Sequence, residues 1–141
     1  MAELLLKKLL LLRTRIARLR AARPIDAEAV ASDERLEAFL AFNLFLAIQD
    51  AVDLAAHLVS ERGLDIPATQ REVFEALGRA GLLSADVVRA MGAMTSLRNR
   101  IAHSYGELDA VRMVRELGDG LDQLERLADE LLVLCPATPG A

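Results

Sequence analysis

Residues 36–59 read LEAFLAFNLFLAIQDAVDLAAHLV and are apolar on almost every side when they are wound into a helix. Such a helix lies either at the centre of a bundle or in an interface with a partner. We therefore expect the rest of the chain to pack around this segment. Capping signals place its start at Ser32, with Asp33 in the first turn, and its end near Gly63.

Four conspicuous polar residues interrupt this apolar helix: Asn43, Asp50, Asp53 and His57. Asp53 and His57 are four residues apart and therefore share one face of the helix. An ion-paired structural couple accounts for these two residues. The alternative is a supporting role for Asp53 beside an active site.

The composition of the 141-residue chain favours an all-α protein. Its hydrophobic fraction is 53%, rich in Ala and Leu, with four Phe, one Tyr and no Trp. Ala and Leu lose little freedom in a helix, whereas strands favour β-branched and aromatic residues. The length fits one domain with a substantial core. We expect a four- to five-helix up-and-down bundle over residues 1–134, followed by a short flexible tail over residues 135–141.

Capping residues mark three further helices after the central one. Thr69 and Glu72 form a capping box at the start of a short helix. Ser84 and Asp109 are suitable N-caps for two longer helices with apolar stripes. With the N-terminal helix, these make five predicted helices.

The N-terminal helix is predicted from about Ala2 to Arg23, where Pro24 stops it. Residues 1–23 hold seven basic side chains against Glu3 alone, a net charge of +6. Because the whole chain carries −4, the remainder carries −10. A basic arm on an acidic body can recruit RNA, an anionic surface or an acidic partner.

One face of this N-terminal helix is apolar, which predicts a bundle helix with a solvated basic face. A helix lying on a membrane surface has a similar pattern and is the alternative. Lys7 and Lys8 interrupt the apolar start, so neither a membrane span nor a signal sequence is expected. The stripe consists of Leu5, Leu9, Leu12, Ile16 and Leu19.

The single cysteine, Cys135, lies in the tail, which leaves no internal disulfide and no multi-cysteine metal site. This cysteine usage fits a reducing cytoplasm. We expect the protein to be cytoplasmic and to carry neither a metal nor a cofactor.

The chemistry is concentrated in residues 98–105, RNRIAHSY, at the end of the fourth predicted helix. The imidazole of His103 can take a proton from a ribose 2′-hydroxyl or return one to a leaving group. A guanidinium such as that of Arg98 binds a phosphate through two hydrogen bonds and offsets transition-state charge. These residue types suit cleavage of a phosphodiester without a metal.

Helix geometry limits how these groups can cooperate. Asn99 and His103 share a face, so Asn99 can orient the imidazole or contact substrate. Arg98 and His103 lie about 140° apart on an ideal helix. Either the helix opens near Ala102, or two subunits of a two-fold dimer each supply part of the site. Taken alone, the pair also fits a solvent-exposed helix end whose Arg and His cap free carbonyls.

The wider pattern resembles the HepT-like branch of the HEPN superfamily. Its signature is matched by Arg98, Asn99, His103 and Tyr105. The resemblance covers roughly residues 36–130. Further matching segments are 45–57, similar to the family's second helix, 63–67 with 71–74, similar to its link into the third, and 106–109.

This resemblance implies a four- to five-helix bundle that dimerises and acts as a metal-independent ribonuclease toxin of a prokaryotic type II or type VII toxin–antitoxin pair. It implies that Arg98 and His103 are catalytic, in a cleft at the dimer interface, and that Asn99 supports them. It also implies a nucleotidyltransferase-type antitoxin that attaches AMP to Tyr105. A ring packed on the bundle is the rival interpretation of Tyr105.

Two features depart from the family pattern. Arg100 adds a second cation inside the motif and either helps to hold RNA or faces solvent. The basic N-terminal helix is less typical, and it is either an RNA-tracking surface or a docking face for an acidic antitoxin. Two competing hypotheses are a non-catalytic HEPN subunit that binds a nucleotidyltransferase, and a membrane-surface anchor formed by residues 1–23. We expect no membrane partner.

Overall fold

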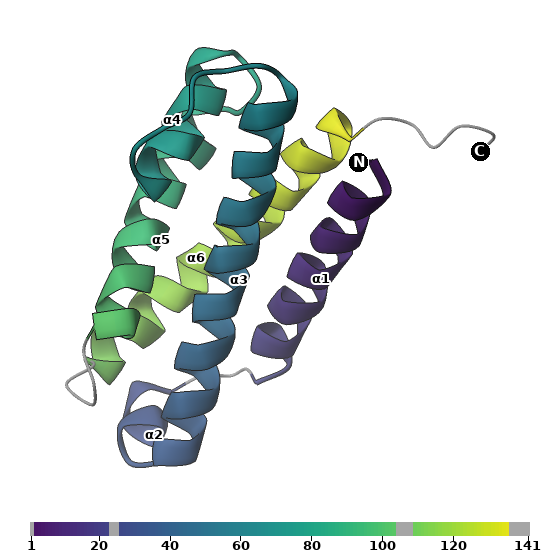
Figure 1. The fold of residues 1–141 in the computed structure, drawn as a ribbon. Coiled ribbons are helices and arrows are strands. Elements are labelled where there is room, and N and C mark those ends of the chain that lie inside the picture. Colours follow the sequence, from purple (N-terminus) through teal and green to yellow (C-terminus); the bar gives the residue numbers. More distant parts are fainter. Residues whose placement is uncertain (1, 23–25, 104–108, 136–141) are drawn as a thin grey trace.

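In the computed structural model, which describes residues 2–22, 26–103 and 109–135, every regular element of the described chain is an α-helix (Figure 1). The prediction of an all-α, up-and-down bundle is confirmed, because α1 and α5 run against α3 (Figure 1). The helices are α1 (Ala2–Ala21), α2 (Ala27–Ala31), α3 (Glu34–Glu61), α4 (Gln70–Arg79), α5 (Ala85–His103) and α6 (Ala110–Leu134).

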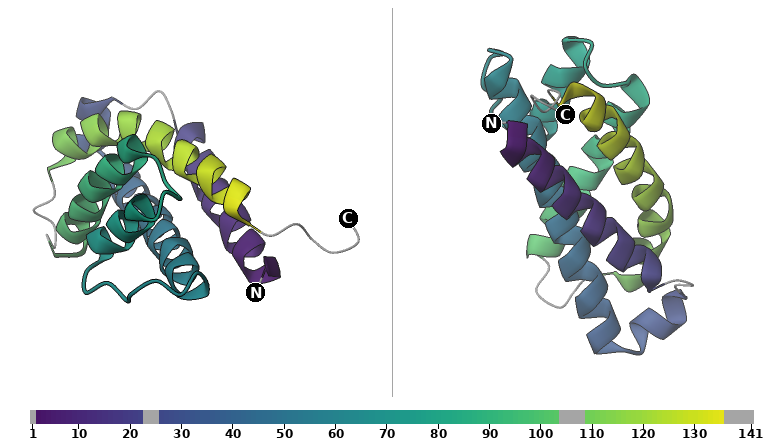
Figure 2. Two further views of the ribbon diagram at one scale, coloured as in Figure 1. Left: turned by 90° about the horizontal axis from the view of Figure 1, so that it is seen from above. Right: turned by 90° about the vertical axis from the view of Figure 1, so that its right-hand side faces the viewer.

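Helix α3 is the centre of the bundle, as its apolar sequence predicted. It packs against all five other helices of the described chain. The left panel of Figure 2 shows α1 on one side of α3 and the pair α4 and α5 on the other, with α6 running across the top of the view. By length and composition α3 could also cross a membrane, but half of its most apolar stretch is buried inside the bundle. Burial in the protein core therefore accounts for its apolar character.

The ends of α3 are set by local capping. Asp33, and not Ser32, is its N-cap, and the Asp33 carboxylate accepts hydrogen bonds from the amides of Arg35 and Leu36. Ser32 instead ends α2, where its hydroxyl donates to the carbonyl of Glu28. The predicted start was therefore one residue early, because the sequence analysis missed α2.

The other predicted caps are confirmed. Thr69, Ser84 and Asp109 each accept a hydrogen bond from an amide in the first turn of the helix that follows. Helix α3 ends as predicted, because Gly63 adopts φ +67°, a conformation that favours glycine. These caps satisfy backbone groups that a helix end would otherwise leave without a partner.

The apolar face of α1 is buried between α3 and α6. None of its five stripe residues exposes more than 2% of its surface. This confirms the interpretation of α1 as a bundle helix. A membrane-surface helix would need the same face for lipid, so the buried stripe argues against that alternative.

Three arginines of α1 are paired with carboxylates of the body. Arg15 Nε lies 2.5 Å from Asp50 Oδ2 of α3, and both side chains are largely buried. Arg13 pairs with Asp129 of α6 at 2.6 Å. Arg20 binds two further α6 carboxylates, those of Asp122 and Glu125. Much of the charge asymmetry seen in the sequence is therefore neutralised inside the fold.

These pairs alter the protonation of their members. Hydrogen bonds from Arg20 to Glu125 and Asp122 raise the pKa of the Arg20 guanidinium above its ordinary value. Burial raises the pKa of Asp50, and the hydrogen bond from Arg15 opposes that rise. Arg15 thus offsets part of the effect of burial on this carboxylate.

Candidate active site

The guanidinium of Arg98 lies in the seam between α5 and α3. Its Nε and Nη2 both donate to Gln49 Oε1, at 3.2 and 3.0 Å. Its Cζ also lies 4.7 Å from the centre of the Phe45 ring, a cation–π distance. Two residues of α3 therefore hold Arg98 in one orientation, and both are uncharged.

A third residue of α3 completes this arrangement. Gln49 Nε2 donates to Asp53 Oδ1 at 3.0 Å, which orients the amide so that its oxygen faces Arg98. Phe45, Gln49 and Asp53 are spaced by four residues and thus form one row along α3. Asp53 thus orients the residue that binds Arg98, and a supporting role for Asp53 beside an active site stays a prediction.

The expected ion pair between Asp53 and His57 is wrong. Asp53 accepts its hydrogen bond from Gln49, and no ion pair joins it to His57 in the described chain. His57 Nε2 is buried without a hydrogen-bond partner among the described residues. A spacing of four residues places Asp53 and His57 on one face of the helix. Gln49 lies four residues away on the other side, and its amide donates the hydrogen bond to the Asp53 carboxylate.

Gln49 and Phe45 were not among the residues predicted to form the site. Both lie in the segment that carried the family resemblance, Gln49 four residues and Phe45 eight residues before Asp53. The regular four-residue spacing of positions 45, 49 and 53 was the signal that could have identified them. What the row faces depends on the packing of α5, which the sequence does not reveal.

His103 lies on a different face of α5 from Arg98. The helix stays regular through His103, which is exposed, whereas Arg98 is half-buried against α3. Opening of the helix near Ala102 is therefore not observed. Within the described chain, no hydrogen bond brings Arg98 and His103 together, and the ideal helix separates them by about 140°.

Asn99 connects the two faces. Its Oδ1 accepts a hydrogen bond from Arg98 Nη1 at 3.2 Å. It is exposed, and it shares the face of His103 because the two residues are four apart. The residue expected to orient the imidazole is thus observed to contact the guanidinium.

Arg100 points to the opposite neighbour. Its Nη2 lies 2.5 Å from Glu116 Oε2 of α6, and Glu116 also pairs with Arg112 at 3.0 Å. This pairing favours a role for Arg100 in joining α5 to α6. Contact of Arg100 with RNA stays a prediction.

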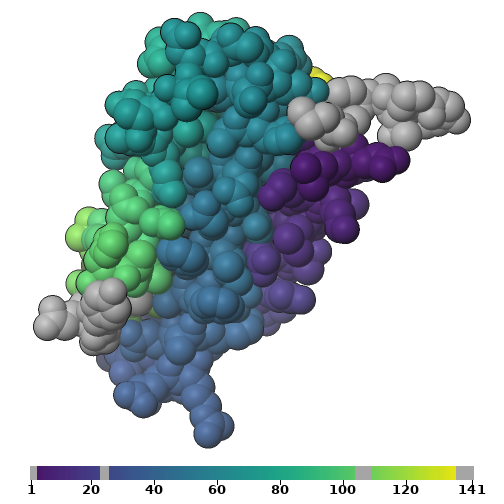
Figure 3. Space-filling view, viewed as in Figure 1, coloured from purple at the N-terminus to yellow at the C-terminus, as the bar shows by residue number. Residues whose placement is uncertain are grey.

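Tyr105, the predicted site of AMP attachment, lies outside the described residues. Helices α5 and α3 adjoin at the molecular surface (Figure 3), and Arg98 between them is partly exposed. No cluster of three or more His, Cys, Asp or Glu side chains able to hold a metal ion occurs in the ranges that the structure describes.

A comparison with known protein families identifies the family of this chain. The model of the family described as "Ribonuclease HepT-like" matches residues 12–131. The chain belongs to the ribonuclease HepT-like family. The match includes α3 and α5 in full, and with them the row on α3, Arg98 and His103.

Individual relatives agree with the family assignment. The chain is 26% identical over 104 residues to the mRNA nuclease HepT of Shewanella oneidensis, which spans 74% of this chain and 78% of that protein. It is 28% identical over 80 residues to the tRNA nuclease HepT of Aphanizomenon flos-aquae, spanning 57% of this chain and 54% of that protein.

A solved structure shares the fold. The tri-AMPylated HEPN toxin of Shewanella oneidensis, solved in complex with the MNT antitoxin, superposes with a TM-score of 0.85 at 23% identity. The match covers 94% of this chain and 99% of that one. The two chains therefore share one fold over most of their lengths.

Proposed function

We propose that the chain is a metal-independent ribonuclease and the toxin of a toxin–antitoxin pair, in which Arg98 binds the scissile phosphate and His103 is the general acid or base. The observation that carries the proposal is the orientation of Arg98 by an uncharged acceptor, Gln49, at the surface of a HepT-like bundle. An arginine held in this way keeps its charge for a phosphate.

The reaction needs only proton transfer and charge stabilisation. The ribose 2′-oxygen attacks the adjacent phosphorus while the imidazole of His103 accepts the 2′-hydroxyl proton. The bond from phosphorus to the 5′-oxygen breaks, and that oxygen takes a proton from an imidazolium. Arg98 donates two hydrogen bonds to the phosphate oxygens as negative charge develops.

We infer that the active unit is a homodimer. Arg98 and His103 diverge on a helix that stays regular, so one copy does not direct both groups at one phosphate. A two-fold axis beside the end of α5 brings the second copy's groups to the same place. Asn99 lies between the two groups, because it accepts a hydrogen bond from Arg98 and shares the face of His103.

Control by an antitoxin is the second part of the proposal. The relative from Shewanella oneidensis is AMPylated and bound to the MNT antitoxin. We propose that a nucleotidyltransferase does the same here: the phenol oxygen of Tyr105 attacks the α-phosphate of ATP, AMP is attached and pyrophosphate leaves. The added anion then occupies the place of a substrate phosphate, two residues from His103. We propose that this chain and its antitoxin both act in the cytoplasm.

Purified protein free of AMP provides the test. We expect it to cleave cellular RNA in the presence of EDTA, and we expect His103→Ala to abolish both cleavage and growth arrest. Intact RNA with the wild-type dimer would overturn the ribonuclease and favour a non-catalytic subunit that binds the nucleotidyltransferase. Intact mass after co-expression with the antitoxin should show one or more added AMP groups, which Tyr105→Phe removes.

A further inference from the structure

A second arginine outside the predicted site is positioned on α5. Arg71, an exposed residue in the first turn of α4, donates from Nη2 to the carbonyl oxygen of Gly92 at 3.0 Å and to Ser96 Oγ at 3.4 Å. A Cβ at position 92 would lie 3.4 Å from both Cζ and Nε of Arg71. The guanidinium therefore lies directly against α5, at a place where a glycine leaves room.

Arg71 resembles Arg98 in the kind of partner that holds it. Among the described residues, these are the two arginines whose side-chain hydrogen bonds all go to uncharged acceptors. An arginine held by a carboxylate has its charge offset, whereas one held by a carbonyl or an amide keeps a full charge for an external anion. The bonded arginines that pair with carboxylates are Arg13, Arg15, Arg20, Arg100 and Arg112.

The partners of Arg71 lie in line with the proposed catalytic histidine. On a helix of 3.6 residues per turn, positions 92, 96, 99 and 103 fall within about 60° of one another. Ser96, Asn99 and His103 are all exposed. Ser96 precedes His103 by two turns, a distance of about 10 Å along the helix axis. Ser96, Asn99 and His103 thus form one exposed strip of α5, with Arg71 of α4 bound at the Ser96 end and His103 at the other.

We propose that Arg71 is a second phosphate-binding residue, which holds the RNA backbone on this strip at a phosphate to one side of the cleaved one. The inference rests on the proposed ribonuclease function. RNA carries a phosphate at every nucleotide, so a strand aligned with the strip presents further phosphates beyond the one at His103. Arg71 supplies sequence-independent affinity and the register of the strand.

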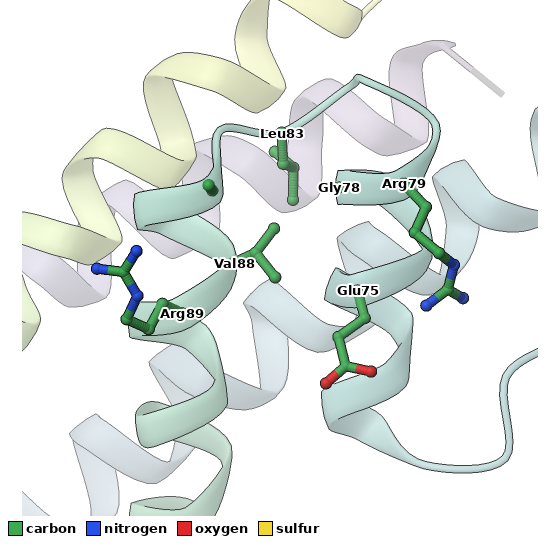
Figure 4. Close-up of a pocket in the computed structure, with 7 residues that line it drawn as sticks. Glu75, Gly78, Arg79, Leu83, Val88 and Arg89 are labelled. Atoms are coloured by element: carbon green, nitrogen blue, oxygen red, sulfur yellow. The ribbon is translucent and has the colours of Figure 1, made fainter.

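A nearby arginine of the same helix offers a matched control. Arg79 is the last residue of α4 and is exposed. Arg79 lies at the edge of a hollow of about 450 Å³ between α4 and α5. Its guanidinium extends outward from that hollow, on the side opposite Arg89 (Figure 4). Arg79→Gln removes one positive charge from α4, as Arg71→Gln does, without touching the strip.

The test is RNA binding in the His103→Ala background, with an unstructured oligouridylate as the probe. Arg71→Gln should weaken binding about three- to tenfold and lower the slope of log affinity against log salt by about 0.7, the contribution of one phosphate contact to a single strand. Arg79→Gln should leave both unchanged. Arg71→Lys, which keeps the charge, should recover most of the slope and covers the case in which Arg71→Gln does not fold.

Two outcomes would overturn the proposal. If Arg71→Gln binds RNA like Arg79→Gln but melts at a lower temperature, Arg71 only joins α4 to α5. If it binds RNA normally but loses affinity for the antitoxin, the strip binds protein. Cleavage by the wild-type dimer is measured separately, so a failure of the ribonuclease proposal is distinguishable from a failure of the Arg71 proposal.

Discussion

Two seams of the bundle are both held by arginines, but they use them differently. Between α1 and the body, Arg13, Arg15 and Arg20 all meet carboxylates. Between α3 and α5, Arg98 meets the amide oxygen of Gln49 and the ring of Phe45. In the first seam the charges are paired with one another and hold the fold together. The second orients a charge without cancelling it, which is what an anion-binding site requires.

The same contrast explains why net charge is a poor guide to function here. The basic N-terminal segment suggested an RNA-tracking surface, yet three of its arginines are paired within the protein. The arginines that we assign to RNA, Arg98 and Arg71, lie on the part of the chain whose total charge is negative. The partner of each arginine, and not the charge of its segment, distinguishes the two roles.

The largest expected effect comes from removing the oriented charge. Arg98→Ala should lower the rate of RNA cleavage about 10²- to 10³-fold, as loss of a transition-state donor does. Its melting temperature should change little, because no buried carboxylate is left without a partner. Cleavage assays and thermal melts measure both. The control is Arg18→Ala, which removes an exposed arginine of α1. A loss of cleavage below about threefold in Arg98→Ala would contradict the assignment of Arg98.

Removing a charge from the other seam should have the opposite pattern. Arg15→Met leaves Asp50 largely buried without its partner, so the free energy of unfolding should fall by about 3 kcal/mol in urea titrations. Cleavage per folded molecule should stay at the wild-type level. Pairing this change with Asp50→Leu should restore most of the stability. Lost cleavage in a folded Arg15→Met protein would show that the seams are not separate.

The loss of stability in Arg15→Met should also depend on pH. Burial already raises the pKa of Asp50, and without Arg15 nothing comparable opposes that rise. The folded variant then binds a proton at a pH where the unfolded chain has released it, so its stability increases as the pH falls through the raised pKa. The deficit relative to wild type should therefore be smaller at about pH 5 than at about pH 7. An equal deficit at both would mean that Asp50 is not its source.

A smaller effect is expected from converting one kind of seam into the other. The double variant Gln49→Glu with Asp53→Asn keeps the net charge and lets residue 53 donate to residue 49, but it places a carboxylate on Arg98. Cleavage should fall about tenfold because the charge of Arg98 is offset. Unfolding free energy should stay within about 1 kcal/mol. Unchanged cleavage would show that the uncharged partner of Arg98 is not required.

The smallest effect is expected at the exposed end of the α1 seam. Arg13 pairs with Asp129, whose side chain is 71% exposed. Arg13→Ala should reduce the free energy of unfolding by less than about 1 kcal/mol, and added salt should shrink the difference further. Denaturant titrations at low and high salt measure this. A loss as large as that of Arg15→Met would mean that burial does not set the strength of these pairs.

Much of the fold was predictable because its signals are local. Gly63, Thr69, Ser84 and Asp109 act where the sequence placed them, since a cap depends on a few neighbouring residues. Helix α2 was missed because five residues are too few to display a period. That omission also moved the predicted start of α3 from Asp33 to Ser32.

The candidate site was predictable only in part. Arg98, Asn99 and His103 were selected from their types and spacing, and the family match includes them. Gln49 and Phe45 were not selected, because their role depends on what α5 places opposite them. The Asp53–His57 pair was wrong for the same reason: spacing shows that two residues share a face, but not which neighbour takes the hydrogen bond.

Residue types and periodicity alone thus predict an all-helical bundle around residues 36–59, because helix formation depends on interactions within a few turns of the chain. They make residues 98–105 a candidate for phosphodiester chemistry, and the family resemblance favours that interpretation over a solvent-exposed helix end. Packing decided which arginines are neutralised. Arg15 meets Asp50 across 35 residues, and Arg98 meets Gln49 across 49. Contacts over such separations depend on how helices dock, and in this protein they separate the arginines that pair with carboxylates from those that we assign to RNA.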